Sequence, residues 1–346
     1  MQLARLHIQN FKGIDDLEIS FLKEGTEEPR PVTLLLGDNG SGKTTVLQAI
    51  ALVLSLATRK FSDVTNFDWP GFLPARVSSR GKTRVELEVM FGEDELTAIR
   101  EAFDLELPGE DSYRKPGRSR RMTLLYENGT VVSPQGIGAE RQFWGRRCIE
   151  PRLNSNPSLR QELNRLGDVF WFDQYRNLAH LSLAKDRGVG ALRQYLIGWW
   201  GVHTSSRRAA GPDYLALLEK GLADLFPGTR FIGVESPPGQ STPTVSDMYF
   251  LIEREGRVYD IAEMSSGEQA IFPLLYQFIR LSIARSVVLI DELELHLHPP
   301  QQQALMAALR RIGPDCQFIV TSHSPHLEQV TPDEDEVRLP GGRRCL

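Results

Sequence analysis

A glycine-rich turn between an apolar strand-like run and an apolar helix-like run constrains this chain more than any other feature. The turn reads GDNGSGKT over residues 37–44 and fills every fixed position of the G-x-x-x-x-G-K-[ST] phosphate-binding pattern. Residues 32–36 before it are typical of a buried parallel strand, and residues 46–56 after it are apolar on nearly all sides, as in a buried helix. The pattern predicts an α/β core built around this turn. A glycine-rich turn before a helix, without a ligand, is the alternative.

The residue types of the turn suit a nucleoside triphosphate. Backbone N–H groups of a loop with little side-chain bulk converge on phosphate oxygens, and the positive end of the following helix adds to their attraction. Lys43 is predicted to reach the β- and γ-phosphates, and the Thr44 hydroxyl to bind Mg²⁺. We therefore expect ATP and Mg²⁺ as cofactors. The predicted nucleotide contacts in the loop are Gly37, Asn39, Gly40, Ser41, Gly42, Lys43, Thr44 and Thr45.

Composition excludes several classes of protein. The chain has 346 residues, 41% hydrophobic and 25% charged, which is typical of a globular protein, and its net charge of −5 gives no overall basic surface for nucleic acid. No apolar run approaches the roughly 18 residues that span a bilayer, and no signal peptide is visible, so we expect a cytoplasmic protein without a membrane partner. The scattered Cys148, Cys316 and Cys345 are predicted to be reduced thiols.

A second group of motifs follows late in the chain. Residues 264–269 (MSSGEQ) open a helical stretch, and the apolar strand 287–290 ends in Asp291 and Glu292. At a strand tip, the first carboxylate can face Mg²⁺ and the second an attacking water. Another strand, 316–320, runs into His323, which is predicted to contact the γ-phosphate or to orient the water. The alternatives are two acids meeting solvent and a histidine that completes a turn.

Between these motifs the chain alternates predicted strands and helices. Residues 3–8 and 17–21 are predicted to pair, residues 83–91 alternate like a half-buried strand of a flanking antiparallel sheet, and residues 169–172 are strand-like. Two hairpins are predicted, at 121–132 and 248–261. Helices are predicted at 93–103, 140–152, 158–166, 190–200 and 212–225. No heptad pattern persists, so we expect residues 93–228 to form an inserted, mostly helical lobe between head segments 1–92 and 229–346.

The stretch 111–152 is locally basic. It holds nine lysine or arginine residues against four acidic ones, with Tyr113, Tyr126, Phe143 and Trp144 among them. Such a stretch can follow a nucleic-acid backbone while the aromatic rings stack on bases. A solvated loop and helix face is the alternative interpretation.

In combination the motifs resemble a known family. The order of GDNGSGKTT, MSSGEQ, VVLIDE and TSHS resembles the ATP-binding-cassette ATPases. The opening LHIQNFKGI and the string DELELHLHP narrow the resemblance to the SMC, RecF and OLD-nuclease type, including ATPase subunits of anti-phage systems such as Septu and PARIS. The resemblance covers roughly residues 1–60 and 260–330. It implies an ABC-type ATPase head with a mixed parallel core sheet and an antiparallel flanking sheet.

The resemblance also implies roles for single residues. Lys43, Glu292 and His323 would be the catalytic phosphate contact, general base and switch histidine, and Thr44 and Asp291 would hold Mg²⁺. Ser265, Ser266 and Gly267 match the signature turn, and Gln174 is the candidate for the metal-binding glutamine. The loop after the acids matches D-E-P-E-x-x-L-H-P at Glu294, Leu297, His298 and Pro299, but Leu293 replaces the proline, which could loosen the turn. We interpret His296 and His298 as part of a packed turn rather than as a metal pair.

In the family that this chain resembles, the signature turn contacts the nucleotide of a second chain. We therefore expect a homodimer with ATP between Lys43 of one copy and Ser265 of the other. The leading hypothesis is a switch or sensor for a separate effector, a nuclease or toxin, in anti-phage defence, since only residues 324–346 follow the switch motif. A DNA-repair or chromosome-associated ATPase that binds DNA through residues 111–152 is the alternative. A transporter subunit fits less well, because about 220 residues separate Thr44 from the signature turn.

Overall fold

Strands whose residues are buried on both faces form the central layer. The computed structural model describes residues 1–69, 71–73, 81–106, 115–172, 189–205, 212–239, 244–245, 247–313 and 315–340. Its central sheet has the strand order β13 (Glu336–Arg338), β3 (Val32–Leu36), β12 (Gln317–Thr321), β11 (Val287–Ile290) and β7 (Val169–Phe172). Every pairing in it is parallel. The prediction of a mixed core sheet is therefore corrected, because the antiparallel strands form separate sheets.

The flanking antiparallel sheet is confirmed. Its strand order is β2 (Ile14–Ser20), β1 (Gln2–Phe11), β4 (Arg84–Met90), β5 (Arg121–Glu127) and β6 (Thr130–Val132). Burial alternates along β4 and β5, as the period of two in their sequences predicts. The predicted hairpin turn between β5 and β6 is formed by Asn128 and Gly129, which both have positive φ angles, 53° and 82°.

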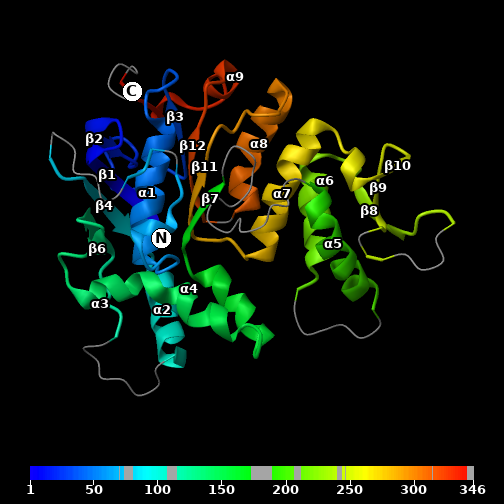
Figure 1. Cartoon of the computed structure of the whole chain (residues 1–346), viewed down its shortest axis with the longest axis horizontal. Helices are drawn as coiled ribbons and strands as arrows, with labels where there is room; N and C mark the ends of the chain where they lie inside the picture. Colours follow the sequence, from blue (N-terminus) through cyan, green and yellow to red (C-terminus); the bar gives the residue numbers. More distant parts are fainter. Residues whose placement is uncertain are drawn as a thin grey trace.

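One buried helix joins these two sheets. Helix α1 (Lys43–Ala57) begins directly after the glycine-rich turn and contacts β1, β4, β5 and β6 on one side and β7 and β12 on the other. Figure 1 shows it standing between the two layers. Nearly all of its residues are buried, which explains why its sequence is apolar all round.

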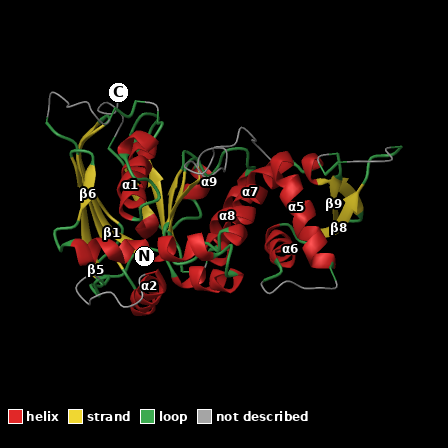
Figure 2. Cartoon of the chain, turned by 60° about the horizontal axis from the view of Figure 1, so that its bottom comes forward, coloured by secondary structure: helices red, strands yellow, loops and turns green. Residues whose placement is uncertain are grey.

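Helices cover the opposite face of the central sheet. They are α6 (Tyr214–Leu225), α7 (Ser266–Arg280) and α8 (Pro299–Ile312), with α5 (Val189–Thr204) and a three-stranded antiparallel sheet beyond them. That sheet has the order β10 (Arg257–Asp260), β9 (Tyr249–Arg254) and β8 (Arg230–Glu235), so the second predicted hairpin is also confirmed. Figure 2 shows α7 and α8 lying between the central sheet and this outer sheet. Apolar residues from all these elements form one continuous core.

The middle of the chain is less separate than expected. Helices α2 (Glu93–Glu106), α3 (Ile137–Glu140) and α4 (Gly145–Ile149) pack beside the head, and the predicted helix at 158–166 is a 3₁₀ segment, Pro157–Arg165. However, β5 and β6 extend the flanking sheet, and β7 is the edge strand of the central sheet. The division at residues 92 and 228 stays a prediction, although residues 121–172 contribute strands to both head sheets.

Two further observations concern the chain as a whole. Within the described residues, no helix has the length and apolar character needed to cross a membrane. Cys148 and Cys316 are buried free cysteines, in agreement with the prediction of reduced thiols, and Cys345 lies outside the described residues.

Candidate nucleotide-binding and hydrolysis site

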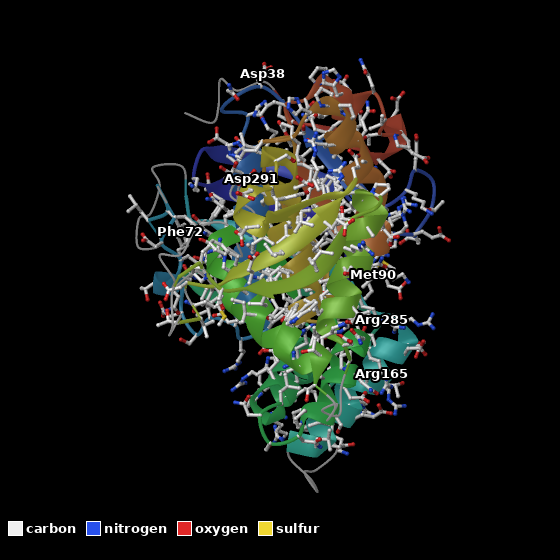
Figure 3. All side chains as sticks on the ribbon, turned by 90° about the vertical axis from the view of Figure 1, so that its right-hand side faces the viewer. Asp38, Phe72, Met90, Arg165, Arg285 and Asp291 are labelled. Atoms are coloured by element: carbon white, nitrogen blue, oxygen red, sulfur yellow. The ribbon has the colours of Figure 1, made fainter. Side chains whose placement is uncertain are left out.

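Three neighbouring parallel strands bring the predicted site residues together. The phosphate loop follows β3, Asp291 and Glu292 follow β11, and His323 lies just beyond β12. Because parallel strands end at the same edge of a sheet, segments more than 240 residues apart in sequence meet there. Figure 3 shows Asp38 of the loop and Asp291 toward the same end of the molecule, with Arg165 toward the other.

The phosphate loop has the backbone that a bound phosphate requires. Gly40 and Gly42 have φ angles of 81° and 95°, in the left-handed region that favours glycine. Gly42 is the N-cap of α1 and gives no side-chain capping bond, and no acidic residue lies in the first turn. The first N–H groups of α1 therefore have no side-chain cap, and they remain available as donors to an anion.

Lys43 and His323 lie side by side in this site. The Lys43 Nζ donates to the carbonyl oxygens of Gly37 at 2.7 Å and Asp38 at 3.1 Å, and it is 3.4 Å from the His323 Nδ1. Burial lowers the pKa of Lys43, and the nearby carboxylates, Glu294 foremost, oppose that shift. The loop therefore holds the Lys43 side chain at its centre, where a phosphate can take over its hydrogen bonds.

Asp291 and Thr44 form the predicted metal side of the site. The Thr44 hydroxyl donates to Asp291 at 3.0 Å, and the Thr321 hydroxyl donates to the same carboxylate at 2.6 Å. Burial raises the pKa of Asp291, while these two hydroxyls and Lys43 act in the opposite direction. Adjacent oxygens in an octahedral Mg²⁺ shell with bonds of about 2.1 Å are about 3 Å apart, so the Thr44 and Asp291 oxygens fit this ion.

Glu292 sits on a strained turn that is tied to the neighbouring strand. Its φ angle is 49°, an unusual value for a residue with a side chain, and its N–H donates to the Thr321 hydroxyl at 2.8 Å. The next N–H, of Leu293, donates to the Thr321 carbonyl at 3.1 Å. A proline has no such donor, so Leu293 anchors the turn here instead of loosening it.

Two residues belong to the site that the sequence interpretation did not place there. Thr321 bonds to both predicted acids, and Glu294 accepts the backbone N–H of His323 at 2.6 Å through Oε1. The other oxygen of Glu294 is buried, and no described residue forms a hydrogen bond with it. Thr321 lies inside the motif TSHS and Glu294 inside the motif DELELHLHP, and these positions are the sequence signal that could have placed both residues in the site.

The signature turn lies elsewhere. Ser265 is exposed and caps α7, where it exchanges hydrogen bonds with Glu268, which in turn pairs with Arg254 at 2.9 Å. Ser266 is the first residue of α7, and a Cβ at Gly267 would lie 2.3 Å from the amide of Gln301 in α8. Among the described residues, no hydrogen bond or ion pair joins Ser265 or Gly267 to the phosphate loop.

Two other predictions have different outcomes. Gln174 lies outside the described residues, so its role stays a prediction. The basic stretch 111–152 is described from residue 115 onward, and several of its cations are paired within the fold. Lys115 binds Asp104, Arg120 binds Glu93, and Arg121 binds Glu27 and Glu88. A continuous basic surface is therefore not formed by these three residues.

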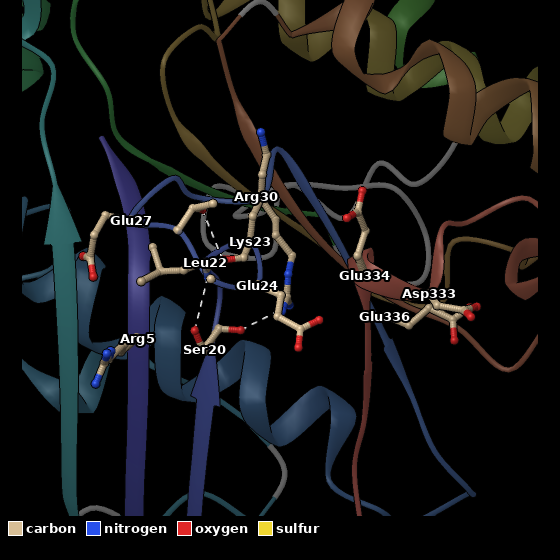
Figure 4. A pocket seen from close by; sticks show the side chains of 12 residues that line it. Arg5, Ser20, Leu22, Lys23, Glu24, Glu27, Arg30, Asp333, Glu334 and Glu336 are labelled. Atoms are coloured by element: carbon tan, nitrogen blue, oxygen red, sulfur yellow. Dashed lines mark hydrogen bonds between the residues drawn. The ribbon is translucent and has the colours of Figure 1, made fainter.

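A cavity of about 580 Å³ lies apart from this chemistry. It is lined by Ser20, by residues 22–27, by Arg5 and Arg30, and by acidic residues near the C-terminal end of the described chain (Figure 4). Its charges are of both signs, and burial raises the pKa of Glu336 at its edge. None of the predicted nucleotide contacts lines it, so it is not part of the candidate site.

Comparisons with known proteins identify the family of this chain. The family described as "AAA domain, putative AbiEii toxin, Type IV TA system" matches residues 32–327. The chain is 21% identical to the Retron Ec83 probable ATPase of Escherichia coli, over 99% of this chain and 72% of that protein. It is 25% identical to the OLD nuclease of Thermus scotoductus, over 95% of this chain and 60% of that protein. It is 22% identical to the Septu protein PtuA of Bacillus mycoides, over 93% of this chain and 38% of that protein.

Among solved structures, the SMC head bound to the C-winged helix domain of ScpA aligns with a TM-score of 0.48 and 13% identity, over 96% of this chain and 93% of that one. The SMC head domain from Thermotoga maritima aligns with a TM-score of 0.43. With a family match from residue 32 to residue 327, and with retron and OLD relatives along nearly its whole length, this chain belongs to that AAA-domain family and is an ATPase with OLD-like relatives.

Proposed function

We propose that the chain is an ATP-driven switch in which two copies close around ATP and signal to a separate effector. The observation that carries this proposal is the separation of the signature turn from the phosphate loop within one chain. The Ser265 hydroxyl bonds to Glu268 at the start of α7, whereas Lys43 bonds to carbonyls of its own loop and lies beside His323. An exposed Ser265 can act on a phosphate only if that phosphate belongs to another copy. Two copies related by a twofold axis satisfy both turns at once.

In this proposal each residue of the sheet edge has one task. The N–H groups of the phosphate loop and Lys43 bind and orient the phosphates. Glu292 takes the proton of the attacking water, and His323 contacts the γ-phosphate. Mg²⁺, held by Thr44 and Asp291, would neutralise charge on the leaving phosphate oxygens. Glu294 and Thr321 fix the positions of His323 and of the two acids.

The assignment of the base is tested with Glu292→Gln. This variant keeps the shape and the backbone bond to Thr321 but cannot accept the proton, so ATP binding should persist, dimers should accumulate with ATP, and turnover should fall by on the order of 100-fold or more. ATP binding is measured by calorimetry and mass by light scattering. Turnover near that of the unaltered protein would show that Glu292 is not the base.

We further propose that the effector is a separate nuclease or toxin in anti-phage defence. The support is the likeness to the retron ATPases and to PtuA of Septu along more than nine-tenths of this chain. The chain spans 72% of the length of the Retron Ec83 protein and 38% of PtuA, so activities of those whole proteins are not carried over. Purification of the tagged chain with its genomic neighbours should recover a complex. Full protection against phage by this chain alone would contradict the proposal.

A further inference from the structure

Three guanidinium groups surround one indole ring at the end of α1 opposite to the phosphate loop. Arg59 lies 4.5 Å from the centroid of the Trp144 ring, Arg147 lies 5.5 Å from it, and Arg141 lies 5.7 Å from it. Each contact is attractive, but three like charges around one ring also repel each other. Bound negative charge would relieve that repulsion.

The backbone holds this cluster in place. The indole N–H of Trp144 donates to the carbonyl of Ala57, the last residue of α1, at 3.1 Å. Arg59 follows with a φ angle of 58°, a left-handed conformation that usually falls to glycine or asparagine at this position after a helix. This conformation is strained in an arginine, and such strain is found preferentially at functional positions.

The charges of this cluster differ from those of the neighbouring basic residues. Arg120 and Arg121 are bound to carboxylates, whereas Arg59 and Arg147 are exposed, and neither forms an ion pair with any residue that the structure describes. The acidic residue in the described lining of the adjacent cavity is Glu140, and its Oε1 accepts the backbone N–H of Ser133 at 3.2 Å. The cluster therefore keeps a positive charge that can attract an anion.

A cavity adjoins the cluster. Its volume is about 360 Å³, within the range of small-molecule sites, and Arg59, Trp144 and Arg147 all line it. Ser62, Thr130 and Glu140 also line it, together with the apolar side chains of Leu56, Phe61, Leu124 and Val131. The cavity thus combines an aromatic ring, an apolar surface and two guanidinium groups.

We infer that this cavity binds one nucleotide unit, with its base against the Trp144 and arginine planes and its phosphate on Arg59 and Arg147. Bases stack on indole rings and on guanidinium planes, and guanidinium groups bind phosphate in a bidentate manner. The inference goes beyond the ATPase switch, because the cavity lies at the opposite end of α1 from the phosphate loop. The same chemistry is offered by a free mononucleotide and by a single-stranded nucleic acid.

The test measures binding of a fluorescent, 5′-phosphorylated oligothymidylate by anisotropy, with Lys43→Ala in every protein so that competitors cannot occupy the phosphate loop. Arg147→Glu should weaken binding by at least about tenfold, since the variant loses both a plane on which the base stacks and a charged contact to the phosphate. Arg120→Glu makes the same charge change in the same stretch and should alter binding less than about twofold. An equal loss of affinity in both variants would show that only the overall charge of the protein matters, and this would overturn the inference.

Competitors then separate the sources of the ligand. Displacement by thymidine monophosphate, but not by inorganic phosphate, supports a nucleotide pocket and admits the free nucleotide. If only longer oligonucleotides displace the fluorescent probe, and Arg147→Glu weakens its binding, the ligand of the site is a single-stranded nucleic acid. Displacement by inorganic phosphate at the same concentration as the nucleotide would overturn the role of the base. Trp144→Phe keeps the apolar packing and should weaken binding less than Arg147→Glu, and melting curves verify that each variant folds.

Discussion

The edge of the central sheet and the signature turn are built in different ways. At the sheet edge, hydrogen bonds join the phosphate loop, the acids and the segment after β12 across about 280 residues of sequence. At the signature turn, the bonds of Ser265 stay within its own helix start, through Glu268. The first region is assembled within one chain, and the second is an exposed contact. This difference supports the proposal that one chain holds a prepared catalytic half and that a second copy supplies its complement.

The largest effect is expected at the assembled region. Lys43→Ala removes the ammonium group that lies among the phosphate-loop carbonyls and His323, so ATP binding and turnover should both fall below detection. Lys23→Ala, which removes an exposed lysine paired with Glu28, is the matched control and should be neutral. Calorimetric titration with ATP checks both variants. Normal ATP affinity in Lys43→Ala would place the nucleotide elsewhere.

A smaller effect, of a different kind, is expected at the signature turn. Ser265→Arg adds a long cation to the proposed contact, so turnover should fall by on the order of 100-fold while ATP binding to the single chain stays within about threefold. Thr204→Arg, at the exposed end of α5, should leave turnover unchanged. The measurement is ATPase rate alongside ATP affinity. Equal loss of affinity and rate in Ser265→Arg would mean that this turn serves its own phosphate loop.

Glu294→Gln should give an intermediate effect with a distinctive pH dependence. The amide oxygen can still accept the N–H of His323, but the carboxylate that most opposes the lowered pKa of Lys43 is lost. The pKa of Lys43 should fall further, so the alkaline limb of the pH profile of turnover should move to lower pH. Turnover should fall by about tenfold, equivalent to ~1.4 kcal/mol. Glu334→Gln, an exposed carboxylate elsewhere, is the control. An unmoved alkaline limb would remove Glu294 from the site.

The smallest effect is on stability without nucleotide. Burial raises the pKa of Asp291, so the folded chain bears a cost for the ionised carboxylate at neutral pH. Asp291→Asn removes that cost, and its melting temperature should rise by on the order of 1–2 °C at neutral pH. This rise in melting temperature should become smaller as the pH falls from the raised pKa of folded Asp291 to the pKa of Asp291 in the unfolded chain. In that range the folded carboxyl becomes protonated and no longer bears the cost of burying a charge. Differential scanning calorimetry across this range checks the sign, and a destabilised Asn variant at neutral pH would contradict it.

The sequence predicted those parts of the site that depend on local patterns. The phosphate loop, the acids after β11 and His323 each follow an apolar strand, and parallel pairing brings such strand ends together. Thr321 and Glu294 were not predicted because their roles arise from the register between β11 and β12 and from the turn after Glu292. Neither contact is visible from spacing along the chain.

The fold was predicted to a similar extent. Alternation in β4 and β5 and the Asn128-Gly129 turn are local and were found, but the sheet that each strand joins depends on tertiary packing. For this reason β7 was assigned to a helical lobe, although it completes the central sheet. The same limit applies to the basic stretch, since the partners of Arg121 are Glu27 and Glu88, from distant segments.

The most direct test of the central claim mixes two inactive proteins. In an ATP sandwich, Lys43→Ala chains supply an intact signature turn, and Ser265→Arg chains supply an intact phosphate loop. A mixed dimer therefore contains one complete site, and an equal mixture should recover about a quarter of the activity of the unaltered protein when dimers form at random. The ATP-sandwich dimer predicts recovery to that level in a steady-state ATPase assay. A mixture no more active than its two components would contradict it.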